Sequence, residues 1–90
     1  MKQWKEHETM NKIEVKKIWI EFDFSDDDGK AQMQMVIDFL KKNYPNFKLG
    51  LKDNILSVDG NGKLLKRISR NIYNNFYVKR VMHEAMEGAQ

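Results

Sequence analysis

The sequence lacks several residue types that define whole classes of protein. It has no cysteine, which excludes disulfides, cysteine-ligated zinc and a thiol nucleophile. It has a single proline, and no apolar run approaches the roughly 18 residues of a membrane helix. The N-terminus also lacks the apolar segment of a signal peptide. These absences, together with a charged content of 32%, predict a cytoplasmic globular protein that does not bind membranes.

Acidic residues are missing from one long stretch of the chain. Residues 60–83 contain no Asp or Glu, and residues 46–83 hold eight Lys or Arg against only Asp53 and Asp59. Residues 1–45 are slightly acidic, so the net charge of +3 hides a strongly basic second half. Clustered cations with few compensating acids are typical of polyanion binding, most often to nucleic acid.

The apolar periodicity changes along the chain and predicts alternating strands and helices. Residues 18–24 alternate apolar and polar as a half-buried strand does, and Lys16-Lys17 marks either a bulge or the strand start. Ser25 to Asp28 can cap a helix that Pro45 stops. Residues 47–58 form two short alternating runs separated by residues 52–54, which indicates a hairpin.

The order of these segments predicts the fold. Residues 1–12 have no sustained period and are expected to be a flexible arm, leaving residues 13–90 as one α+β domain. The expected architecture has two layers in the order β-α-β-β-α, with helices on one face of a mainly antiparallel sheet. Residues 77–86 fit either a helical extension or a closing strand.

Residues 63–76, KLLKRISRNIYNNF, predict an amphipathic helix with an unusual polar face. Its apolar stripe consists of Leu65, Ile68, Ile72 and Phe76. A solvated helix face normally mixes charges of both signs, whereas this helix has cations only. We expect phosphate contacts from the cations of this region and hydrogen bonds to sugars or bases from two asparagines. The predicted RNA-binding residues are Lys63, Lys66, Arg67, Arg70, Asn71, Asn74, Lys79 and Arg80.

Three patterns that resemble catalytic or metal sites are incomplete. His83-Glu84 begins a zincin motif, but position 87 is Glu rather than a second His. The acidic run before Gly29 lacks the flanking oxygen ligands of a calcium loop, and residues 60–63 lack the spacing of a phosphate loop. We therefore expect no catalytic residue, no metal and no cofactor. Trp19, and Trp4 in the arm, could be either base-stacking contacts or anchors.

Several short strings resemble the eukaryotic large-subunit ribosomal protein twenty-two family. These are residues 20–23 with 27–29, residues 36–42, residues 52–58 and the pair Lys66-Arg67, within roughly residues 18–82. The resemblance implies a non-catalytic protein of the cytosolic large subunit that grips structured rRNA, with Lys66, Arg67 and Arg70 as RNA contacts. The family has lysines in the second half of this helix, where this chain has asparagines.

A second hypothesis involves protein partners instead of RNA. The same basic face could bind an acidic protein, or an exposed edge strand could pair with a partner. A neighbouring protein within a ribonucleoprotein is compatible with either hypothesis.

Overall fold

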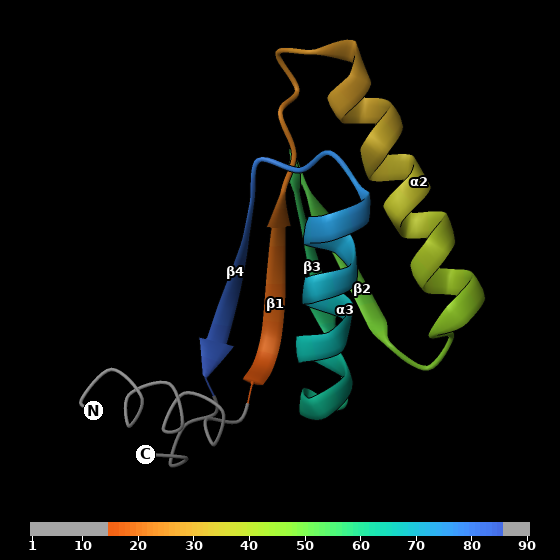
Figure 1. The fold of residues 1–90 in the computed structure, drawn as a ribbon, viewed down its shortest axis with the longest axis vertical. Helices are drawn as coiled ribbons and strands as arrows, with labels where there is room; N and C mark the ends of the chain where they lie inside the picture. Colours follow the sequence, from red (N-terminus) through yellow and green to blue (C-terminus); the bar gives the residue numbers. More distant parts are fainter. Residues whose placement is uncertain (1–14, 86–90) are drawn as a thin grey trace.

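The computed structural model describes residues 15–85, which form a four-stranded sheet covered on one face by two helices (Figure 1). This two-layer α+β fold confirms the predicted class. The predicted arm, Trp4 and the last residues of the chain lie outside the described residues. The elements are β1 (Val15–Glu21), α2 (Asp27–Asn43), β2 (Lys48–Lys52), β3 (Ile55–Asp59), α3 (Gly62–Asn75) and β4 (Arg80–Ala85).

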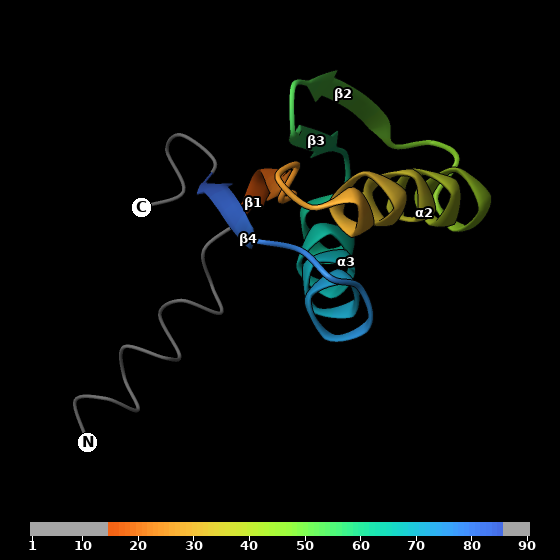
Figure 2. The same cartoon turned by 90° about the horizontal axis from the view of Figure 1, so that it is seen from above.

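The strands do not lie in sequence order. Their order across the sheet is β2-β3-β1-β4, and every neighbouring pair is antiparallel. Each helix therefore connects two strands that have a third strand between them, which is the split β-α-β arrangement, also called ferredoxin-like. Viewed from above, both helices lie on the same side of the sheet (Figure 2). The opposite side of the sheet has no helix over it among residues 15–85, and we call it the open face.

Alternation along β1 divides its side chains between the two faces. Ile18 and Ile20 are fully buried toward the helices, whereas Lys17 and Trp19 lie on the open face. The pairing of β1 with β4 shifts between Val15 and Lys17, so the predicted irregularity at this position is a bulge. The bulge explains why Val15 can be buried although its phase in the sequence is opposite to that of Ile18.

The core lies between the sheet and the helices. α2 contributes Val36 and Leu40, which are fully buried. α3 contributes the predicted stripe, with three members fully buried and Phe76 packed against them. Within the described residues, the buried apolar side chains are Val15, Ile18, Ile20, Phe22, Val36, Leu40, Leu56, Val58, Leu65, Ile68 and Ile72.

Both helices begin at capping side chains. Asp26 accepts a hydrogen bond from the amide of Asp28 at the start of α2, and Asn61 accepts from the amides of Lys63 and Leu64 at the start of α3. α2 ends at Asn43, two residues before Pro45, as predicted. The caps therefore set the residue at which each helix begins. The cap of α3, Asn61, is uncharged.

Two further predictions concern the turn at residues 52–54 and the segment at residues 77–86. The predicted hairpin is present, with Asp53 and Asn54 between β2 and β3, and Asp53 adopts a φ of 53°, a left-handed conformation that Asp tolerates. Residues 77–86, which fitted both periods, form a strand over Arg80–Ala85 rather than an extension of α3. β4 pairs with β1, and among the strands of residues 15–85 it lies at the edge of the sheet.

Candidate nucleic-acid interface

α3 presents its cations on the side opposite the core. Lys63, Arg67 and Arg70 are all exposed. At about 100° per residue these three positions lie within about 60° of one another, roughly opposite Leu65. We call these three residues the α3 basic face. The arrangement follows from the sequence because the apolar stripe must face the sheet, which forces the cations outward.

No carboxylate neutralises the α3 basic face within residues 15–85. The ion pairs of the described chain join Lys16 to Glu84 and Lys79 and Arg80 to Glu21, none of which involves the α3 basic face. The first turn of α3 also contains no acid, so the helix dipole adds to the positive charge there. Among residues 15–85, the α3 basic face therefore holds three exposed cations without a carboxylate partner.

Lys66 lies beside this face rather than in it. Lys66 is half-buried, and its positive charge lowers the pKa of His83 on β4. On the helix, Lys66 is about 100° from Arg67 toward the β4 side. The structure thus places one of the predicted contacts at the boundary between α3 and β4.

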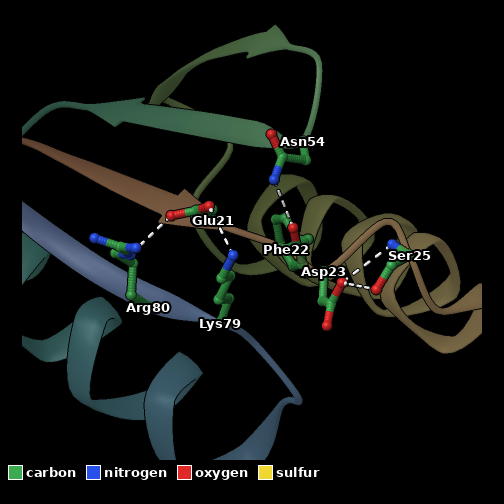
Figure 3. Close-up of polar contacts among 7 residues, drawn as sticks. All are labelled: Glu21, Phe22, Asp23, Ser25, Asn54, Lys79 and Arg80. Carbon is green, nitrogen blue, oxygen red and sulfur yellow. Dashed lines mark hydrogen bonds and ion pairs between the residues drawn. The ribbon is translucent and has the colours of Figure 1, made fainter.

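Lys79 and Arg80 are held apart from the α3 basic face. The Nζ atom of Lys79 lies 3.6 Å from Glu21 Oε2, and the Nε atom of Arg80 lies 2.8 Å from Glu21 Oε1 (Figure 3). The Glu21 side chain is 17% exposed, so it is well placed to neutralise both cations. Arg80 is also the β4 partner of Glu21 and shares the open face with it. The predicted set of RNA contacts is therefore divided between two sides of the molecule.

The two predicted asparagines differ in availability. Asn74 is exposed and lies in the same arc as the α3 basic face. Asn71 is half-buried, and its side-chain oxygen accepts a hydrogen bond from Asn75 Nδ2 at 3.3 Å. Asn74 is therefore the more accessible of the two to a ligand on this face, whereas Asn71 is less exposed and already accepts one hydrogen bond.

A polar pair that the sequence did not predict joins α3 to β4. Ser69 is 7% exposed, and its Oγ atom lies 2.8 Å from Nε2 of His83. Burial lowers the pKa of His83, and the nearby charge of Lys66 lowers it further. On a helical wheel Ser69 lies about 40° from Leu65, which was the available signal that its side chain faces the core.

Trp19 occupies the middle of the open face. It is half-buried, its indole N–H donates to Glu84 Oε1 at 3.3 Å, and Lys17 Nζ lies 4.6 Å from the ring centroid. Its two cross-strand neighbours are Ser57 and Met82. Of the two roles predicted for Trp19, anchor and stacking contact, these contacts favour the anchor.

Comparison of the chain with protein-family models, curated proteins and solved structures finds no match. The resemblance to a ribosomal protein family therefore stays a prediction. Within residues 15–85 no group of acidic or imidazole side chains is arranged to hold a metal ion. In the same part of the chain, neither helix has the length and apolar content to cross a membrane.

Proposed function

We propose that this chain is a non-catalytic RNA-binding protein that holds structured RNA through the α3 basic face. The proposal extends to rRNA of the large ribosomal subunit in the cytoplasm, where the family resemblance implies a structural role in translation. The observation that carries it is the absence of any neutralising carboxylate at three clustered exposed cations, within the described part of the chain.

The shape of the face favours duplex or folded RNA. The opposite side of α3 packs in the core, so the backbone positions from which the α3 basic face projects are set relative to one another. Side chains cannot read the deep major groove of A-form RNA, and contacts therefore go to phosphates and 2′-hydroxyls. Cations with an exposed amide beside them, as Asn74 is here, suit that kind of recognition.

Binding through this face should depend steeply on salt. Each neutralised phosphate releases condensed counterions, and the slope of log affinity against log salt is about −0.9 per contact for duplex DNA. If the three residues of the α3 basic face each contact one phosphate, the slope includes the effect of roughly three phosphate contacts.

The test compares two sets of alanine substitutions with one labelled RNA stem-loop. Changing Lys63, Arg67 and Arg70 together should weaken binding and reduce the salt slope by about three. The matched control changes Lys79 and Arg80, whose charges Glu21 already neutralises, and it should alter binding much less. Both proteins should retain the wild-type circular dichroism spectrum.

Two results would count against the proposal. One is a wild-type affinity for the stem-loop that does not change between two ionic strengths. The other is an equal loss of binding in both substituted proteins. A protein purified free of nucleic acid that retains an acidic protein partner after nuclease treatment would support the interaction-module hypothesis instead.

A further inference from the structure

The sheet ends in two edge strands, and they differ in how they would meet a second strand. Neither β2 nor β4 has a strand partner on its outer side among residues 15–85. An unpaired edge is a template for pairing, and natural edges often carry Lys residues that discourage it. β2 follows that rule, because antiparallel pairing of two copies centred on Gly50 would place Lys48 of each copy opposite Lys52 of the other.

β4 has the opposite property. Arg80, Met82 and Glu84 alternate onto the open face, as their cross-strand partners Glu21, Trp19 and Lys17 do. In an antiparallel pairing of two copies centred on Met82, Arg80 of each copy lies opposite Glu84 of the other. Opposite charges at directly paired positions stabilise a sheet, and like charges destabilise it. β4 is therefore complementary to itself.

We propose that the outer edge of β4 is a self-association surface, at which two copies of the chain pair about a two-fold axis through Met82 to form one continuous eight-stranded sheet. This inference does not depend on RNA binding. A continuous sheet requires that paired residues face the same side, so the axis must pass through a residue and not between two. Met82 is the position that matches Arg80 with Glu84.

The charges in the cross-strand rows of Arg80 and Glu84 fit this pairing, and Glu84 also has Lys16 at 3.4 Å and accepts from the Trp19 indole within its own copy. Across one monomer, the cross-strand row containing Arg80 reads Lys52, Ile55, Glu21, Arg80, and the row containing Glu84 reads Lys48, Asp59, Lys17, Glu84. When the two copies pair, the Arg80 row of one copy continues into the Glu84 row of the other. From Glu21 of the first copy to Lys48 of the second, successive charges in this joined row alternate in sign. Arg80 would then lie between two carboxylates.

The remaining rows add apolar contact. On the open face, the two Met82 side chains would meet at the axis, extending the surface formed with Trp19 in each copy. On the helix face, Val81 of each copy would lie opposite His83 of the other, and Val81 already packs against the core. The pairing also puts both helix layers on the same side of the sheet, with one α3 helix on each side of the axis.

The test exploits the fact that a residue on a two-fold axis meets itself. Sedimentation equilibrium of the wild-type chain should show a monomer–dimer equilibrium. Met82→Lys and Met82→Glu should each raise the dissociation constant by roughly fivefold or more, because like charges would be paired. A 1:1 mixture of the two variants should form heterodimers, since Lys then meets Glu. Leu51→Lys, on the exposed part of the other edge, should leave the dissociation constant unchanged.

Several outcomes would overturn this inference. A wild-type chain that stays monomeric up to about millimolar concentration does not use this surface. A dimer that is insensitive to both Met82 substitutions uses another interface. A mixture that fails to associate, while both variants keep the wild-type melting temperature, shows that Met82 does not lie on the axis.

Discussion

The Nε2 atom of His83 lies 2.8 Å from the hydroxyl oxygen of Ser69, and this contact ties the edge strand β4 to the buried side of α3. Ser69 is the one polar residue among the buried side chains of the described residues. The contact therefore holds the last strand against the helix layer at a point where the core would otherwise be entirely apolar.

Folding stability should fall as the pH is lowered through the range in which histidine titrates. Burial and Lys66 hold the pKa of His83 below its ordinary value of about 6.5. The unfolded chain therefore binds a proton more readily than the folded chain does. The contribution is fully present above about pH 6.5 and is lost as the pH falls toward the folded pKa. Melting temperatures at pH 7.5 and 5.5 measure this loss.

His83→Gln is the control for this prediction. The variant keeps a polar group opposite Ser69 but cannot gain a proton, so its melting temperature should change less between the two pH values. His7, the other histidine of the chain, is present in both proteins and cancels in the comparison. Equal changes in the wild type and the variant would show that His83 does not cause the pH dependence.

The cap of α3 should contribute measurably to stability. Asn61 Oδ1 accepts hydrogen bonds from the amides of Lys63 at 3.0 Å and Leu64 at 3.3 Å. Asn61→Ala removes both and should lower the free energy of unfolding by about 1 kcal/mol, within a range of about 0.5 to 2. Urea denaturation measures the change. Asn74→Ala, at an exposed position of the same helix, should have almost no effect.

Asn61→Asp should separate stability from RNA binding. Aspartate retains the cap and adds a negative charge at the N-terminus of α3, which should leave stability equal or higher by a few tenths of a kcal/mol. The same charge lies two residues from Lys63, so affinity for the RNA stem-loop should fall if the α3 basic face binds phosphates. Unchanged affinity at low salt would indicate that RNA does not approach the start of this helix.

Gly29 should not tolerate a side chain. A Cβ atom added at Gly29 would clash with the carbonyl oxygen of Asp23, which is backbone and cannot rotate away. Gly29→Ala should therefore destabilise the protein by about 1 to 3 kcal/mol, although alanine is the better helix former. Gly50→Ala is the matched control, because its Cβ would meet only the rotatable hydroxyl of Ser57. Urea denaturation of both variants distinguishes a local clash from a general effect of the substitution.

Local patterns in the sequence predicted most elements of the fold. Asp26, Pro45 and the irregularity at Lys16-Lys17 each act within a few residues, so their effects on the backbone could be recognised from neighbours alone. The stripe of α3 was equally predictable, since Leu65 and Ile68 obey helical spacing. The structure of residues 77–86 was not predictable, because their apolar spacing fits both a helix and a strand. Only their pairing with β1 selects the strand.

The sequence predicted the part of the candidate site that lies on one helix, but not the contacts that join distant segments. The exposure of Arg67 and Arg70 follows from the helix they belong to. The place of Arg80 depends on which face of a strand it occupies and on its contact with Glu21, 59 positions earlier in the chain. The pairing of Ser69 with His83 likewise requires knowing that β4 lies beside α3. Contacts between distant segments leave no mark in local periodicity.

The position of β1 at the centre of the sheet sets the order in which this chain can acquire its structure during synthesis. Its two neighbours, β3 and β4, both come from the second half of the chain. Among the described strands, only β2 and β3 are consecutive in the sequence and also paired in the sheet, so this hairpin can form early. β1 has no strand partner until residue 55 has been synthesised. Long-range pairing of this kind slows folding. The nascent first half should therefore remain sensitive to proteases until residues 80–85 emerge and close the sheet.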